Sequence, residues 1–195
     1  VSMVLEATNI IGGKYTPGSS GNTIERYNPA TGELVGTFVG STSEDVDSAI
    51  KSAREAFEKS SWPKDPKFRV HVLRELHDAI MNNFEFMAKI QTSENGKIIR
   101  DSRVELNSAA DLFDYYSGLV RGVYGKTNLP YEDTMSFIIR EPMGVVGIIA
   151  PWNAPIVLLA RSLAPALAAG NTVVIKPASF TPITIRRSYS THSGK

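Results

Sequence analysis

The chain has 195 residues, 42% of them hydrophobic and 21% charged, which is ordinary for a globular protein with one large domain or a domain with appendages. Its formal net charge of +1 gives no electrostatic reason to expect nucleic acid or an anionic membrane as a partner. Because the sequence contains no cysteine, disulfides, thiolate metal sites and a cysteine nucleophile supplied by this chain are all excluded.

The first forty residues favour short strands broken by turns. Thr23–Tyr27 and Leu34–Val39 have β character, and the turn-forming run Asn28–Gly32 separates them. We therefore expect short antiparallel strands in this part of the chain.

The next eighty residues favour helices, because apolar residues recur at three- and four-residue intervals. Ser43 is a plausible N-cap of the first helix, which Pro63 ends. The apolar stripes are expected to form the core of a helical layer rather than to contact a cofactor. Three further helices are predicted at Lys67–Asn83, Phe84–Glu94 and Arg100–Arg121.

The last third of the chain changes character again. Ser136–Arg140 has β character with polar ends, which predicts an exposed or edge strand. Gly144–Ala150 and Thr172–Ile175 are short apolar runs typical of buried parallel strands. The Ala- and Leu-rich segment Ala154–Ala169 between them predicts a helix that Gly170 terminates. Strand, helix and strand form one βαβ unit with a right-handed crossover.

Ligands of open parallel sheets bind beyond the carboxyl ends of the strands. That edge comprises Ala150–Asn153 after the first strand and Lys176–Ser179 after the second. The side-chain amide of Asn153 can donate to a developing oxyanion, and Lys176 with Ser179 can hold ribose hydroxyls or a phosphate.

Structural roles compete with each of these assignments. Asn153 stands where a helix cap is expected, Lys176 can be a solvated lysine at a strand end, and Trp152 can serve in packing. The usual glycine-rich phosphate-binding motifs are absent, so the residues alone leave both interpretations open. His71 and His77, six residues apart, fall on different sides of a helix, and no metal site is expected.

Several segments of the chain together carry a family resemblance through their order and spacing. They are Gly12-Gly13, Asn28–Gly32, Val46–Phe57, Glu141–Gly147, Pro151–Pro155, Pro165–Val174, Lys176–Ser179 and Thr181-Pro182. Over about Ile10–Thr184 they resemble the aldehyde dehydrogenase superfamily, and are nearest to its succinic-semialdehyde-type members. The resemblance implies an α/β fold, the N-terminal part of the aldehyde dehydrogenase fold, for residues 1–184. This part comprises an incomplete Rossmann-like parallel sheet with helices plus short antiparallel strands, with residues 134–141 as an oligomerisation strand.

The resemblance also implies chemistry. In this family an active-site cysteine attacks an aldehyde, hydride passes to the nicotinamide, and a glutamate-activated water releases the acid. Asn153 matches the residue whose amide donates to the tetrahedral oxyanion, and it is the implied catalytic residue here. The implied cofactor-binding residues are Ile149, Ala150, Pro151, Trp152, Lys176, Ala178 and Ser179.

Two positions bear on specificity. Ser179 stands where many members have a glutamate that grips both ribose hydroxyls. Since a carboxylate there would repel a 2′-phosphate and a serine beside Lys176 accommodates one, either NADP or NAD is expected as cofactor, with a lean towards NADP. Arg161 matches an arginine that helps to hold the substrate carboxylate in succinic-semialdehyde-type members, and the competing interpretation is a surface arginine.

The chain departs from the family in ways that affect activity. The catalytic cysteine and the base glutamate have no counterpart, so we expect this chain alone to be an inactive part of an NAD(P)-dependent enzyme that oxidises an aldehyde to a carboxylic acid. Ser162 replaces the usual lysine, and the likeness stops near Thr184. Residues 185–195 are expected to form a divergent, disordered polar tail, which suggests truncation.

A two-stranded parallel unit is not expected to cover both faces of its sheet, and Thr172–Ile175 would expose an unpaired apolar edge. The chain is therefore expected to be marginal, aggregation-prone or dependent on a partner. Homo-oligomers are expected, and an alternative function is a non-catalytic interaction module that pairs with full-length subunits through Ser136–Arg140. An unrelated nucleotide-binding α/β domain is the third hypothesis. No secretory leader is recognised, which favours a cytoplasmic location.

Overall fold

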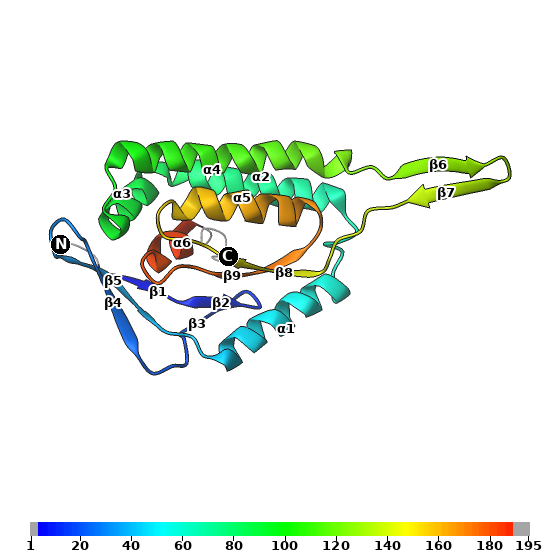
Figure 1. Cartoon of the computed structure of the whole chain (residues 1–195). Coiled ribbons are helices and arrows are strands. Elements are labelled where there is room, and N and C mark those ends of the chain that lie inside the picture. Colours follow the sequence, from blue (N-terminus) through cyan, green and yellow to red (C-terminus); the bar gives the residue numbers. More distant parts are fainter. Residues whose placement is uncertain (1–3, 189–195) are drawn as a thin grey trace.

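Helices lie on both faces of a short parallel sheet in the computed structural model, which describes residues 4–188 (Figure 1). The strands β8 (Val145–Ile149) and β9 (Thr172–Lys176) pair in parallel, and α5 (Pro155–Ala168) crosses over between them. The predicted βαβ unit is therefore confirmed. On its other side α5 packs against α4 (Ile99–Leu119) and α2 (Pro66–Asn82).

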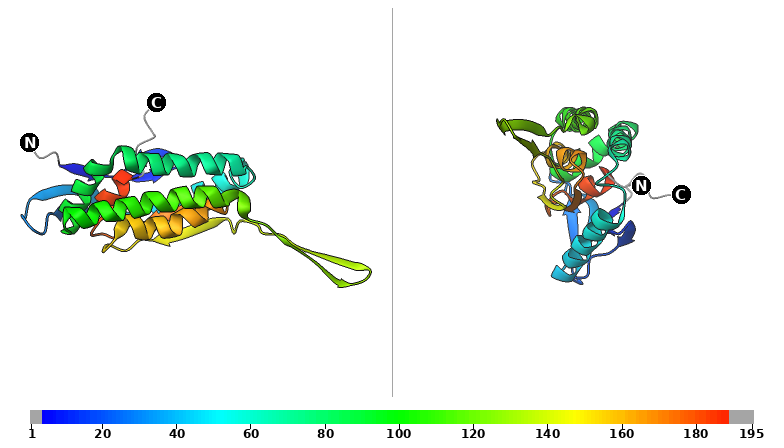
Figure 2. Two further views of the ribbon diagram at one scale, coloured as in Figure 1. Left: turned by 90° about the horizontal axis from the view of Figure 1, so that it is seen from above. Right: turned by 90° about the vertical axis from the view of Figure 1, so that its right-hand side faces the viewer.

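The face of the sheet opposite α5 is covered by α1 (Ser43–Lys59), as two perpendicular views show (Figures 1 and 2). The Thr172 hydroxyl donates to the carbonyl of Ala53 in α1 at 2.9 Å. The expectation that one face stays uncovered is therefore wrong, because a helix from far earlier in the sequence supplies the cover. The outer edge of β9 has no strand partner within residues 4–188.

The main hydrophobic core lies between the helices and the sheet. It includes the fully buried side chains of Leu73, Ile80, Leu106, Phe113 and Leu159, which come from α2, α4 and α5. The apolar stripes of α2, α4 and α5 thus form a core, as expected, whereas on α1 the stripe is largely exposed and only Ala53 is buried.

A second, mixed sheet lies at the N-terminal end of the chain. Its central strand β5 (Leu34–Val39) pairs antiparallel with β4 (Thr23–Tyr27) and parallel with β1 (Leu5–Ala7). The strands β2 (Asn9–Ile11) and β3 (Lys14–Thr16) form a separate antiparallel hairpin. Short antiparallel strands are confirmed here, whereas the parallel pairing of β1 had no signal in the sequence.

Local capping sets where the first helices begin. The N-cap of α1 is Thr42 rather than Ser43, because the Asp45 carboxylate accepts the Thr42 N–H at 3.0 Å in a capping box. In α2, the Asp65 carboxylate accepts from the backbone N–H of Lys67 and of Phe68, at 2.9 and 3.1 Å.

A single buried asparagine fixes the amino ends of β8 and β9. Asn171 Oδ1 accepts the Gly144 N–H at 3.0 Å, and its Nδ2 donates to the carbonyl of Ala166 in α5 at 3.1 Å. Gly170, with φ +92°, makes the tight turn out of α5 that an L side chain rarely adopts. The register that follows places Ile149 opposite Lys176 at the far end of the strands.

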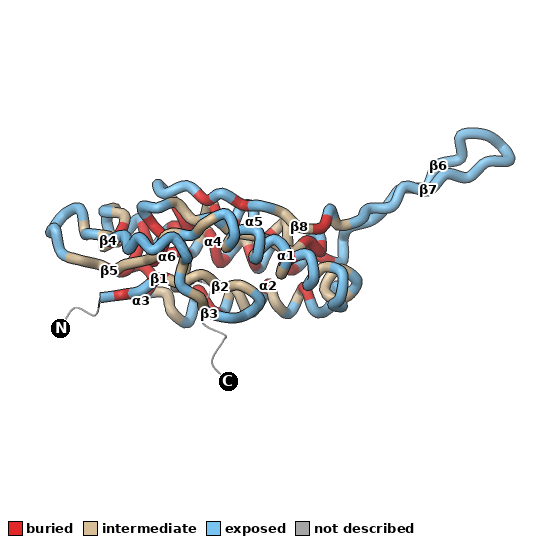
Figure 3. Tube along the Cα trace, turned by 90° about the horizontal axis from the view of Figure 1, so that it is seen from below, coloured by how far each residue is buried: buried red, intermediate tan, exposed pale blue. Residues whose placement is uncertain are grey.

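An exposed hairpin projects from the body of the molecule (Figures 1 and 3). It comprises β6 (Lys126–Tyr131) and β7 (Thr134–Ile138), which pair antiparallel and are exposed at every position. The strand predicted at residues 136–140 is confirmed for residues 136–138, which lie in β7, whereas residues 139 and 140 fall outside it. Its partner β6 was not predicted. The exposed apolar side chains of this hairpin are Leu129, Tyr131, Met135, Phe137 and Ile138.

The end of the described chain corrects one prediction. Helix α6 (Pro182–Ser188) packs against α3 (Phe84–Asn95), and Ile183 and Ile185 are buried. Residues 185–188 are therefore helical rather than part of a disordered tail, since alternate apolar residues reach the core. The rest of the predicted tail, residues 189–195, lies outside the described residues.

Among residues 4–188, no helix is both long and apolar enough to cross a bilayer. His71 and His77, the two histidines weighed as ligands, each face a neighbouring carboxylate instead. His71 Nε2 lies 3.2 Å from Glu75, and His77 Nδ1 lies 2.9 Å from Asp78.

Candidate functional site

The carboxyl ends of β8 and β9 lie level with each other and define one edge of the sheet. Ile149 pairs with Lys176, and the Ala150 N–H donates to the Lys176 carbonyl at 3.0 Å. We call this edge, residues 149–153 together with residues 176–179, the carboxyl shelf. The two predicted halves of the site are thus brought together by strand register alone.

Most of the predicted site residues present their side chains to solvent on the carboxyl shelf. Ile149 is 79% exposed, unusual for an aliphatic residue that ends a strand. Ala150 differs, because its side chain is 3% exposed and packs in the core. The shelf residues that the structure leaves exposed are Ile149, Pro151, Trp152, Asn153, Lys176 and Ser179, and Ala178 is half-buried.

Trp152 borders a cleft of about 290 Å³ between the carboxyl shelf and the N-terminal strands. Its ring packs edge to face against that of Phe180, with 6.1 Å between the two centroids. Arg26 Cζ lies over the Phe180 ring, 5.1 Å from its centroid. The indole is still 53% exposed, so packing against Phe180 leaves much of its surface open to a ligand.

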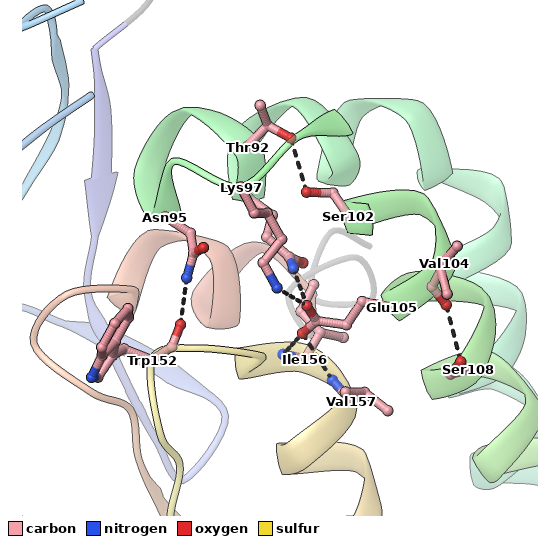
Figure 4. Close-up of polar contacts among 11 residues, drawn as sticks. Thr92, Asn95, Lys97, Ser102, Val104, Glu105, Ser108, Trp152, Ile156 and Val157 are labelled. Atoms are coloured by element: carbon pink, nitrogen blue, oxygen red, sulfur yellow. Dashed lines mark hydrogen bonds and ion pairs between the residues drawn. The ribbon is translucent and has the colours of Figure 1, made fainter. Parts of the chain in front are cut away.

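The structural alternative for Asn153 does not hold. Helix α5 begins at Pro155 with Ala154 as N-cap, and no side chain at the N-cap position accepts a bond. The carboxylate of Glu105 in α4 takes that role, because its Oε1 accepts the N–H groups of Ile156 and Val157 at 2.8 and 3.2 Å (Figure 4). Asn153 itself is exposed, and within residues 4–188 no hydrogen bond engages its side-chain amide.

Glu105 is only 6% exposed, and its charge is balanced by Lys97, which lies in the turn between α3 and α4. Its Oε2 accepts from Lys97 Nζ, with which it forms an ion pair, and from Gln91 Nε2. A buried carboxylate needs such partners, since an unpaired charge in the interior is costly. The positive end of α5 adds to the compensation.

A second buried glutamate caps α6 in the same manner. Glu94 accepts the N–H groups of Ile183 and Thr184 at 3.0 and 2.7 Å, and α6, like α5, begins with a proline. Burial raises the pKa of the Glu94 carboxyl above its ordinary value of 4.5, against the opposing effect of these bonds and of Arg26. Glu94 thereby holds the chain just beyond Ser179.

The family of the chain follows from comparison with known sequences. A model of the aldehyde dehydrogenase family matches residues 15–190. The chain belongs to this family. The expectation that the likeness stops near Thr184 is wrong, because the match extends to residue 190 and helix α6 follows that point.

Curated aldehyde dehydrogenases resemble the chain over most of its length. Aldehyde dehydrogenase 1 of Tanacetum cinerariifolium is 41% identical over 89% of the chain, which spans 35% of that protein. The mitochondrial succinate-semialdehyde dehydrogenase of Oryza sativa subsp. japonica is 37% identical over 93% of the chain and 34% of its own length. The chain therefore spans about a third of the length of these relatives.

Solved aldehyde dehydrogenases share the fold. The NAD-dependent enzyme of Sinorhizobium meliloti superposes with a TM-score of 0.91 at 35% identity, covering 96% of this chain and 38% of the other. Betaine aldehyde dehydrogenase of Staphylococcus aureus, solved in complex with NAD+, superposes with a TM-score of 0.89 at 34% identity, covering 94% of this chain and 37% of the other. The α/β fold and its assignment as a part of the aldehyde dehydrogenase fold are confirmed.

Two features of the site were not found from the sequence. Glu94 and Glu105 lie on helices whose apolar stripes gave no reason to examine acidic residues. One signal was available: Ala154 and Pro155 give α5 a start without a side-chain acceptor, so its cap had to come from elsewhere. Arg161, which was predicted, is exposed on α5, a placement compatible with both of its proposed roles.

Proposed function

We propose that this chain forms the cofactor-binding part of an NAD(P)-dependent aldehyde dehydrogenase that oxidises an aldehyde to a carboxylic acid. The observation that carries the proposal is the carboxyl shelf, where Asn153 follows the exposed Trp152, is itself exposed, and makes no side-chain hydrogen bond within residues 4–188. Lys176 stands opposite Ile149 in the strand register. This combination of apolar surface, cation and amide fits a dinucleotide whose reactive ring must approach a polarised carbonyl.

The residues divide between holding the cofactor and polarising the substrate. Ile149 and Trp152 offer apolar surface to the flat rings, and Lys176 with Ser179 offers a cation and a hydroxyl to the ribose. The cofactor, when bound, supplies the hydride acceptor. The amide of Asn153 donates to the substrate oxygen as negative charge develops there, and losing such a donor typically costs about 3–4 kcal/mol of transition-state stabilisation.

The shelf fits either form of the cofactor. Relatives are described as NAD-dependent or as complexes with NAD+, which supports NAD as a ligand. Ser179 carries no negative charge that would repel a 2′-phosphate, and the exposed Lys176 lies three residues before it in the sequence. These two residues support NADP as a ligand as well. We propose that both bind, with tighter binding of NADP.

A fluorescence titration tests the cofactor site. The chain has two tryptophans, so NAD+ or NADP+ is added to the chain and to a Trp152→Phe variant while emission is recorded. The proposal expects saturable quenching that the variant loses. Equal quenching in both proteins, or none at millimolar cofactor, contradicts it.

The proposal also requires a sulfur nucleophile from outside this chain, because its 195 residues include no cysteine. The chain is therefore expected to show no aldehyde oxidation by itself. Arg161, exposed on α5, is proposed to hold the carboxylate of a semialdehyde substrate, a class named for one relative. Turnover of an aldehyde by the purified chain alone contradicts the mechanism.

A second proposal is that the chain assembles with copies of itself or with longer subunits through the β6–β7 hairpin. The hairpin is exposed at every position and contacts no other helix or strand of residues 4–188 closely. An isolated two-stranded hairpin is marginal in water, and exposed apolar patches often mark interaction sites. Sedimentation analysis of the chain tests this, and a monomer at all accessible concentrations contradicts it.

A further inference from the structure

The turn between α3 and α4 carries polar side chains that reach the loop containing Asn153. We call residues 91–105 the α3–α4 corner. Gly96, with φ +85°, ends α3, and a Cβ on it would lie 2.6 Å from the Pro29 ring, so only glycine fits this tight turn. Thr92 and Ser102, whose hydroxyls lie 2.8 Å apart, join the two helices across the corner.

The α3–α4 corner holds the backbone on both sides of Asn153 (Figure 4). Before it, the carbonyl of Trp152 accepts from Asn95 Nδ2. After it, the N–H groups of Ile156 and Val157 donate to Glu105, whose carboxylate Lys97 in turn fixes. Only residues 153–155 separate these two anchored points, so the backbone that carries the Asn153 side chain has little freedom to change direction.

The anchoring also removes a competitor for the amide of Asn153. Asparagine is among the preferred capping residues, and the orphan N–H groups of α5 lie only three and four residues beyond it. If those groups had no other acceptor, the Asn153 side chain would be drawn to them. Glu105 occupies both, and Asn153 stays at the carboxyl shelf instead.

We propose that Asn95, Lys97 and Glu105 are positioning residues that keep the Asn153 amide directed away from α5 and available on the carboxyl shelf. The importance of this for catalysis rests on the proposed function of Asn153. The positioning itself is a property of the chain without cofactor or substrate, so it is tested separately.

The test follows the side-chain NH₂ signals of Asn153 by NMR in the ¹⁵N-labelled chain, with assignment by their loss in Asn153→Ala. Glu105→Gln keeps the shape of the side chain and removes its charge, and Lys97→Met removes the cation that holds it. In both variants the Asn153 signals are expected to shift or broaden. Lys97→Arg retains the cation and is expected to restore the original signals.

Glu85→Gln is the matched control. Glu85 in α3 accepts two hydrogen bonds from Arg103 in α4, at 2.8 and 2.9 Å, so the variant breaks another carboxylate link between the same helices. Within residues 4–188, Glu85 makes no hydrogen bond or ion pair with α5. Its Asn153 signals are expected to stay in place.

One outcome overturns the proposal. If Glu105→Gln perturbs the backbone amides of Ile156 and Val157 but leaves the Asn153 side-chain signals unchanged, the corner serves helix capping alone. If Glu105→Gln fails to fold, Asn95→Ala provides the same test, because it removes the half-buried donor to the Trp152 carbonyl on the other side of Asn153. Unchanged Asn153 side-chain signals in that variant would likewise contradict the proposal. Because no cofactor is added, a failed cofactor titration would count against the proposed function and leave this result standing.

Discussion

Replacement of Asn171 by alanine is expected to destabilise the chain, because it removes two side-chain hydrogen bonds at the amino ends of β8 and β9. Asn171 is 6% exposed, and its side chain bonds the N–H of Gly144 and the carbonyl of Ala166. In the variant, the Ala166 carbonyl still accepts a hydrogen bond from the backbone N–H of residue 171, which lies 3.0 Å away and is unchanged by the substitution. The Gly144 N–H, in contrast, loses this acceptor in a buried position.

The magnitude follows from these bonds. Leaving a buried donor unsatisfied costs about 1–3 kcal/mol, and the second hydrogen bond contributes about 1 kcal/mol. The free energy of unfolding is therefore expected to fall by about 2–4 kcal/mol. Because Asn171 also sets the register that places Ile149 opposite Lys176, weaker cofactor binding is expected to accompany the loss.

Urea unfolding followed by far-UV circular dichroism measures the change. Asn107→Ala is the matched control, since Asn107 is exposed on α4 and alanine favours a helix. A loss in Asn171→Ala no larger than that in the control would refute the reasoning from buried hydrogen bonds.

Three further predictions concern pH, cofactor affinity and assembly. Because burial raises the pKa of Glu94, the folded chain keeps this proton to higher pH than the unfolded chain, and the free energy of unfolding should fall as pH rises from 4.5 through the folded pKa. Glu94→Gln should lack this part of the pH profile in urea titrations, and parallel profiles contradict the assignment. Lys176→Met should weaken NADP+ binding roughly tenfold or more in a calorimetric titration, as expected for loss of a charged hydrogen bond, whereas unchanged affinity removes Lys176 from the site. Phe137→Ser, on the 68% exposed side chain in β7, should shift sedimentation towards smaller species, and an unchanged distribution places assembly elsewhere.

The elements that were predicted well are those whose signals are local. Strands such as Val145–Ile149 are short apolar runs between turn-forming residues, although the structure leaves them largely half-buried rather than buried as predicted. The crossover helix follows from its composition and from Gly170. The carboxyl shelf then follows from topology, because parallel strands end at the same edge. The structure places the two predicted segments at one edge of the sheet, and the roles of their residues in binding and catalysis stay predictions.

The elements that were missed depend on distant contacts. Glu105 caps a helix that begins 50 residues later in the chain, and nothing in its immediate sequence distinguishes it from a surface glutamate. The strand β6 contains Pro130 and is exposed throughout, so it lacks the alternation that marks a half-buried strand. Helix α6 was not predicted because it has only two buried isoleucines, Ile183 and Ile185, and a run of polar residues follows them.

The most direct test of the central claim maps where cofactor contacts the chain. Backbone amide signals of the ¹⁵N-labelled chain are recorded during a titration with NADP+. The account predicts shifts concentrated on the carboxyl shelf, at Ile149, Trp152, Asn153, Lys176 and Ser179, with Gly144 and Asn171 at the opposite end of the same strands unaffected. Shifts concentrated at that opposite end would contradict it, as would the absence of shifts at a cofactor concentration that saturates related aldehyde dehydrogenases.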